Sequence, residues 1–277
     1  MLEDLLEAES AEKGPWKMIF LAMAIGAVAI ALAIVISSGT ETGHLIVAFA
    51  CIAAAPLMVR VIEIEEHEDT EPWLANSEIG LLVRHGDMIA VFAFYFIGII
   101  VITSLFFVVF PVPVMDSAFA SQLNELNAIQ GMRATGNVAS PCGFACLVEN
   151  NMSVLALVFL FSFVFGAGAV YIITWNASIV GVLIGTLARQ QAAATGSSLI
   201  MAYLIALPYA LISLFPHGIF EIGSYLLGGL AAGILSSALI RKDYKNRAVL
   251  RDIVTITLLA IVCVVIGAAI EAAAAAV

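Results

Sequence analysis

Few groups in the sequence can do chemistry, and the two most distinctive lie in the motif Pro-His-Gly-Ile-Phe-Glu at residues 216–221. Pro216 suits the first turn of a helix, where its missing N–H group costs no hydrogen bond. If a helix begins there, His217 and Glu221 are four residues apart and share one face. The pair would then be able to share a proton or contribute to a cation site. A structural alternative is an interfacial pair that fixes a tight hairpin between two spans.

His217 and Glu221 are functional candidates because ionisable groups inside a membrane are costly and often functional. The dipole at a helix N-terminus would also favour a negative charge on Glu221. A metal site would need a third ligand from Glu41, His44 or Glu149, since two ligands on one helix do not complete a site. The sequence leaves the presence of a metal open, and it indicates no catalytic residue and no cofactor.

Asparagine residues form the second set of candidates, at the two ends of an apolar run. Asn150 and Asn151 open the run, and Asn is a favourable helix N-cap. Asn176 follows Trp175 after the run ends, which predicts an interrupted helix. Broken helices at membrane depth are typical of ion and substrate sites in transporters. The alternative is a helix–turn–helix corner in which Asn176 is simply a cap.

Two pairs of glycines have the spacing of close helix contacts: Gly181 with Gly185, and Gly229 with Gly233. This small-xxx-small pattern lets two helix backbones approach closely. We interpret these contacts as packing inside one chain, with the face of a homodimer as the alternative. The sequence alone does not separate these two interpretations.

Composition defines the elements that must position these residues. Hydrophobic residues make up 62% of the 277 residues, charged residues make up 12%, and the mean hydropathy is +1.08. A soluble domain has about a quarter of its residues charged, so a soluble enzyme, a disordered regulator and a disulfide-stapled secreted domain are excluded. The apolar stretches are continuous, unlike the alternating strands of a membrane barrel. The sequence therefore predicts an all-α, polytopic helical membrane protein.

Seven apolar runs are candidates for crossing a hydrocarbon core, which takes about 20 helical residues. They lie near residues 17–38, 45–60, 88–110, 152–174, 198–215, 219–240 and 253–271. Pro56 and Pro208 interrupt two of these runs, which membranes tolerate where neighbours satisfy the freed carbonyl groups. An eighth stretch, residues 176–190, is too short to span alone and predicts a re-entrant or interfacial helix. Residues 17–277 thus form a single transmembrane domain.

The basic residues predict the orientation of the spans in a cell membrane. With a cytoplasmic N-terminus, ten of the eleven Lys and Arg residues fall on the cytoplasmic side, and only Arg133 falls outside. This distribution follows the positive-inside rule, and seven spans then place the C-terminus outside. The loop at residues 111–151 lies outside, where Cys142 and Cys146 can form a disulfide.

The acidic residues gather in two solvated segments. Residues 1–16 predict an acidic amphipathic helix, and its charge argues against a cleaved signal peptide, which has a basic start. The second segment, around residues 63–71, predicts at most weak binding of divalent cations. The net charge of −10 argues against nucleic acid as a partner, because binding to phosphates needs basic clusters.

The order and spacing of several motifs over about residues 80–270 resemble the stage II sporulation protein M family of integral membrane proteins. The motifs are Asn150-Asn151, Phe165-Gly166-Ala167-Gly168, Asn176, Gly181 and Pro216-His217-Gly218-x-x-Glu221. The resemblance implies a non-enzymatic membrane scaffold, which in endospore-forming bacteria serves peptidoglycan-degrading partners during engulfment. Similar proteins occur in organisms without spores, so the resemblance does not carry the sporulation role to this chain.

Three functional hypotheses follow. The first is a scaffold in membrane or envelope remodelling that lies in the lipid bilayer, with a homodimer or envelope proteins as partners. The second is a channel or transporter for a proton, an ion or a small solute that uses Asn176, His217 and Glu221. The third, an intramembrane metallohydrolase, lacks a complete ligand set and any recognisable hydrolase motif. A transport pathway predicts a polar cavity that reaches Asn176 and Glu221, whereas a scaffold predicts these groups bonded within a closed bundle.

Overall fold

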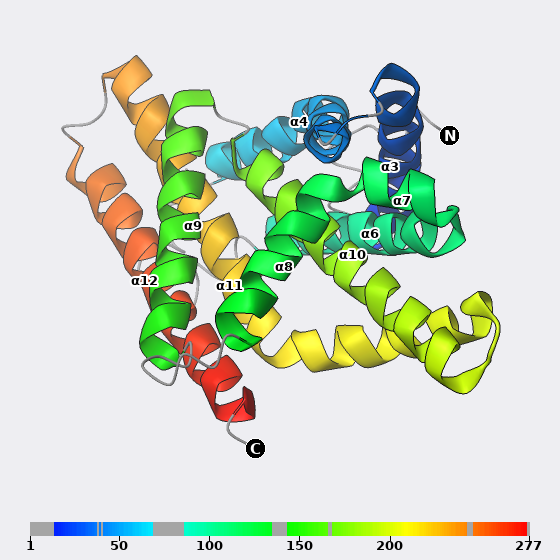
Figure 1. Cartoon of the computed structure of the whole chain (residues 1–277). Coiled ribbons are helices and arrows are strands. Elements are labelled where there is room, and N and C mark those ends of the chain that lie inside the picture. The colour runs from blue at the N-terminus through cyan, green and yellow to red at the C-terminus, as the bar shows by residue number, and fades with distance from the viewer. Residues whose placement is uncertain are drawn as a thin grey trace.

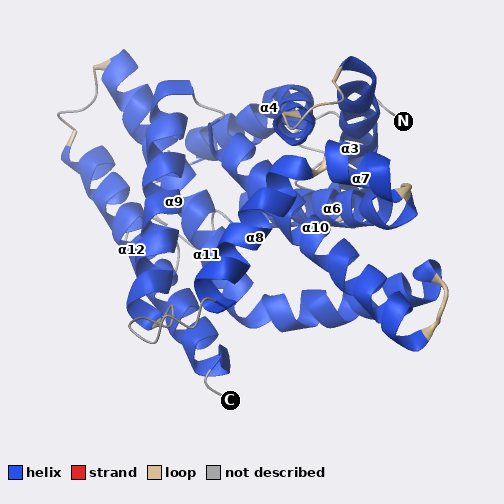
Figure 2. Cartoon of the chain, in the orientation of Figure 1, coloured by secondary structure: helices blue, strands red, loops and turns tan. Residues whose placement is uncertain are grey.

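A computed structural model describes residues 14–37, 39, 41–68, 86–134, 143–165, 168–242 and 246–275 of the chain. Over these residues the chain is helical and contains no strand (Figures 1 and 2). The predicted N-terminal helix lies largely outside the described residues. The helices are α3 (Lys17–Ile36), α4 (Thr42–Glu68), α6 (Gly86–Val109), α7 (Val112–Ala118), α8 (Ala120–Ala134), α9 (Phe144–Phe165), α10 (Gly168–Thr195), α11 (Leu199–Arg241) and α12 (Arg247–Ala275).

Seven of these helices, α3, α4, α6, α9, α10, α11 and α12, are long and apolar enough to cross a membrane. Many of their large apolar side chains are exposed, including Val35 at 84% and Ile212 at 72%. Contiguous apolar surface of this kind suits contact with lipid rather than water. The all-α polytopic architecture and the number of spans are therefore confirmed.

The expected break at Trp175 and Asn176 is wrong. Helix α10 runs without interruption through both residues, so residues 176–190 are the second half of a span and form no separate re-entrant helix. The chain turns earlier, because α9 ends at Phe165 and α10 begins at Gly168. A Cβ atom at Gly168 would lie 2.2 Å from the carbonyl carbon of Phe161. The two helices can therefore turn this tightly only with a glycine there.

The expected hairpin at Pro216 is also wrong. Residues 198–215 and 219–240 belong to one helix, α11, which contains both Pro208 and Pro216. Figure 1 shows that α11 bends: its yellow part crosses the lower part of the view, and its orange part rises beside α12. Proline bends a helix because it removes one backbone hydrogen bond and crowds the preceding turn. The total of seven spans survives because α10 adds one span and α11 merges two.

The described part of the segment predicted as an outside loop, residues 111–134 and 143–151, is largely helical. It contains α7, α8 and the first turns of α9. Met115, Phe119 and Leu126 from α7, α8 and the turn between them pack with buried side chains of α3, α4, α6 and α10 in a second core cluster. The larger cluster joins α3, α4 and α6 to α9–α12 and includes Tyr95, Ile173 and Leu227. The helices α7 and α8 are therefore part of the packed bundle.

Candidate functional site

Three polar side chains form a hydrogen-bonded chain between α9 and α11. The Nδ2 of Asn151 donates to Oε1 of Glu221 at 2.9 Å, and the Tyr225 hydroxyl donates to Oδ1 of Asn151 at 3.2 Å. Both Asn151 and Tyr225 are 5% exposed. Because hydrogen bonds satisfy the buried amide and the carboxylate, the arrangement avoids the cost of leaving such groups unpaired in an apolar interior.

Local structure explains how these residues meet. Glu221 and Tyr225 are four residues apart on α11, so they lie one above the other on a single helix face. Asn151 is the eighth residue of α9, which begins at Phe144, so it is not the helix cap that the sequence predicts. Its side chain is free to cross to α11 because it has no backbone N–H groups to cap at that position.

Helix α12 packs against this cluster, which otherwise lies between α9 and α11. A Cβ atom at Gly267 would lie 3.2 Å from Cγ of Glu221 and 3.4 Å from the His217 carbonyl oxygen. Glu271 follows Gly267 by four residues, so the two residues lie on the same face of α12. Tyr225, Gly267 and Glu271 are absent from the sequence-based candidates. The available signals were the four-residue spacings from Glu221 to Tyr225 and from Gly267 to Glu271.

His217 lies one turn before Glu221 on the same helix. The Glu221 carboxylate accepts a hydrogen bond from Asn151 of α9. No group of three or more metal-ligating side chains is found among the described residues. His44, a predicted third ligand, stacks on Trp175 with the ring centroids 4.7 Å apart.

Asn176 lies inside α10, where its Nδ2 donates to the carbonyl oxygen of Ile172 at 2.8 Å. The side chain therefore bonds within its own helix and does not join the Glu221 cluster.

The glycine pairs pack mainly inside the chain. A Cβ atom at Gly181 would lie 2.8 Å from Thr103, and one at Gly185 would lie 2.5 Å from Phe107. Both glycines therefore allow α10 to pack closely against α6. A Cβ atom at Gly229 would lie 2.8 Å from Ala169 of α10, while Gly233 is partly exposed. At three of the four positions, the absent side chain thus makes room for a neighbouring helix of the same chain.

Comparison with known proteins identifies the family. The family model described as Stage II sporulation protein M matches residues 88–275. The chain belongs to the stage II sporulation protein M family. No curated protein and no solved structure matches the chain. The match covers more than half of the chain and contains Asn151, Glu221 and Tyr225, so the family assignment made from the motifs is confirmed.

A second polar junction, which involves helix α4 outside the family match, joins α4, α8 and α10. The amide nitrogen Nε2 of Gln122 on α8 donates to the Gly43 carbonyl at 3.1 Å and to the Ser178 hydroxyl at 3.2 Å. Gln122 is fully buried, and its Oε1 has no hydrogen-bond partner among the described residues. A Cβ atom at Gly43 would lie 2.2 Å from this oxygen. Sequence reasoning missed Gln122 because its partners lie far away in the chain.

Arg189 provides another polar contact within the family segment. Its guanidinium group on α10 donates to the carbonyl oxygens of Phe107 and Val108 at the end of α6 and of Phe110 just beyond it. Terminal carbonyl groups of a helix lack partners within the helix, and they favour a nearby positive charge. Arg189 thus fastens α10 to the end of α6.

The cysteines differ in state. Cys146 is disulfide-bonded, whereas Cys51 and Cys263 are free. Cys142, the predicted partner of Cys146, lies outside the described residues.

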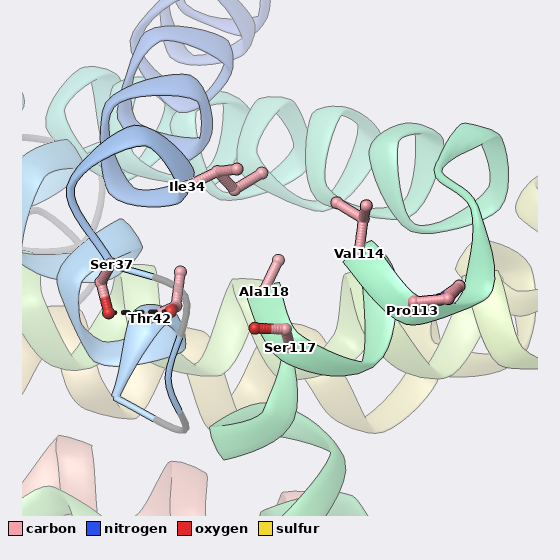
Figure 3. Close-up of a pocket in the computed structure, with 7 residues that line it drawn as sticks. All are labelled: Ile34, Ser37, Thr42, Pro113, Val114, Ser117 and Ala118. Carbon is pink, nitrogen blue, oxygen red and sulfur yellow. Dashed lines mark hydrogen bonds between the residues drawn. The ribbon is translucent and has the colours of Figure 1, made fainter.

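A cavity of about 220 Å³ lies between the α3–α4 connection and α7 (Figure 3). Its lining residues are Ile34, Ser37, Thr42, Pro113, Val114, Ser117 and Ala118. None of the residues singled out from the sequence lines it.

Proposed function

We propose that the protein is a non-enzymatic membrane scaffold in membrane or envelope remodelling. The observation that carries the proposal is the bond between Asn151 and Glu221, since the charged group in α11 is used to join α11 to α9. Membership of the stage II sporulation protein M family is in keeping with this role.

The surroundings of the polar candidates support the scaffold over a transport pathway. Asn176 bonds to its own helix and Glu221 bonds to Asn151. This is the arrangement expected of a closed bundle in which polar groups hold helices together.

We place the N-terminus in the cytoplasm and the C-terminus outside. With α10 as a full span, Arg189 moves to the outer side, so nine of the eleven basic residues are cytoplasmic and two, Arg133 and Arg189, are outside. The distribution still follows the positive-inside rule. It places α7 and α8 on the outer face.

Helix α8 then offers the surface for envelope protein partners. Its buried side, with Gln122 and Leu126, faces the bundle, while Asn124 and Glu125 are exposed. A polar helix held rigidly at the membrane surface is a suitable platform for a protein partner.

Site-specific photo-crosslinking in cells of the native host tests this proposal. A photoreactive residue at Glu125 should give a discrete protein adduct, and the same residue at lipid-exposed Leu258 of α12 should not. An absence of protein adducts at Asn124 and Glu125, with the variants folded and present in the membrane, would contradict the scaffold proposal.

Proton or cation transport is the second candidate, favoured by one observation. Glu221 on α11 packs against Gly267 of α12, and Glu271 follows Gly267 by four residues, so the two helices that carry these acidic groups are in close contact. Transport predicts ion flux in proteoliposomes that is lost in Glu271→Gln and retained in Glu125→Gln. Equal rates with and without protein would contradict it.

A further inference from the structure

We propose that the cavity between α7 and the α3–α4 connection is a binding site for one hydrocarbon chain of a membrane lipid, with the ester or ether oxygen of that lipid accepting a hydrogen bond from the Ser37 hydroxyl. The inference is independent of the proposed scaffold role. It depends on the chemistry of the cavity walls, on the surface around its mouth and on the hydroxyl groups at one end.

The walls of the cavity suit a hydrocarbon chain. Ile34, Pro113, Val114 and Ala118 contribute carbon surface, and no charged side chain lines the cavity. A charged ligand would lose its hydration there without gaining a counter-charge. A hydrocarbon chain has no such cost, and it fills space that would otherwise lack van der Waals contacts.

The surface beside the cavity faces lipid. Val35 and Ile36, next to Ile34, are 84% and 65% exposed, and Val112, next to Pro113, is 52% exposed. Val35 and Ile36 lie at the end of α3, and Val112 follows the end of α6 by three residues. Both α3 and α6 are long and apolar enough to cross a membrane. A lipid chain is therefore able to enter sideways from the bilayer without crossing a polar barrier.

Hydroxyl groups define the polar end of the site. Ser37 and Thr42 oxygens lie 3.2 Å apart, and Thr42 also donates to the Gly39 carbonyl at 2.6 Å. Figure 3 shows these two hydroxyl groups together at one side of the cavity, with Ile34 and Val114 beyond them. Thr42 directs its single proton to Gly39, so the Ser37 hydroxyl, which rotates to suit its partner, is the donor for a lipid ester or ether oxygen. Neither group carries a charge.

Native mass spectrometry of the full chain, released from nanodiscs of one defined phospholipid, tests the site. The wild type should retain one lipid, and Val114→Trp, which fills the cavity, should retain several-fold less. Val112→Trp is the matched control, since it adds the same side chain to the same helix outside the cavity. Equal retention by the wild type and Val114→Trp would overturn the proposal, and so would equal loss in both tryptophan variants.

A second pair of variants keeps the test decisive if Val114→Trp does not fold. Ser37→Ala should weaken retention of ester and ether lipids, whereas Ser213→Ala, on the exposed face of α11, should not. Retention measured in nanodiscs of ester lipids and in nanodiscs of ether lipids shows whether the site prefers an ester or an ether linkage of the hydrocarbon chain. Unchanged retention in Ser37→Ala would contradict the assigned polar end. A protein dimer that dissociates in Val114→Trp would show that a second copy, rather than a lipid, occupies the cavity.

Discussion

The Glu221 cluster and the Gln122 junction both join helices through polar side chains, but the first contains a charged carboxylate and the second a neutral amide. At the first, a carboxylate on α11 accepts from Asn151, whose own oxygen accepts from Tyr225. At the second, the neutral amide of Gln122 enters a space left by Gly43, and its oxygen has no hydrogen-bond partner within the described part of the chain. Removing a partner from a charged group costs more than removing one from a neutral group. The first junction should therefore depend on hydrogen bonds, and the second on shape.

The largest effect is expected for Asn151→Leu. This change removes the donor to Glu221 and the acceptor of Tyr225 together, so it should cost about 3 kcal/mol of unfolding free energy. Unfolding of the protein in lipid nanodiscs or bicelles measures the loss.

A double-mutant cycle sharpens this prediction. The variant that combines Asn151→Leu with Glu221→Leu should recover part of the loss, because no charged group then remains unpaired. Strictly additive losses would show that Asn151 and Glu221 do not interact.

A smaller effect is expected for Gly43→Ala at the second junction. Its methyl group would collide with the Gln122 amide, and overpacking of this kind costs about 2 kcal/mol. Gly223→Ala is the matched control, because the space around Gly223 within α11 is open. Thermal unfolding of the two variants should separate them, and the same loss in both would contradict the shape argument.

The smallest effect is expected for Gln122→Met. The change removes two hydrogen bonds but also the buried oxygen that has no partner, so stability should change by less than about 1 kcal/mol. A loss as large as that of Asn151→Leu, measured by the same unfolding assay, would remove the difference between the two junctions.

The sequence was sufficient for the fold class, the number of spans and the family, because these follow from continuous apolar runs and motif order. It misplaced two breaks for a physical reason. Pro216 and Asn176 are typical of helix ends, yet in α11 and α10 they lie inside long helices, while the tight turn depends on Gly168.

The site was only partly predictable. Asn151 and Glu221 stood out because polar groups are rare in apolar runs, but their bond joins residues 70 positions apart. Nothing in local spacing indicates such a contact. The same holds for Gln122, whose burial depends on Gly43, 79 positions away.

Proton and cation flux in proteoliposomes tests most directly the claim that Glu221 joins helices and does not conduct ions. Wild type, His217→Ala and Glu221→Gln are compared with protein-free liposomes, after each variant is shown to be folded. The scaffold account predicts the same background flux in all four preparations. Flux in the wild type that disappears in Glu221→Gln would contradict it and establish a transport pathway.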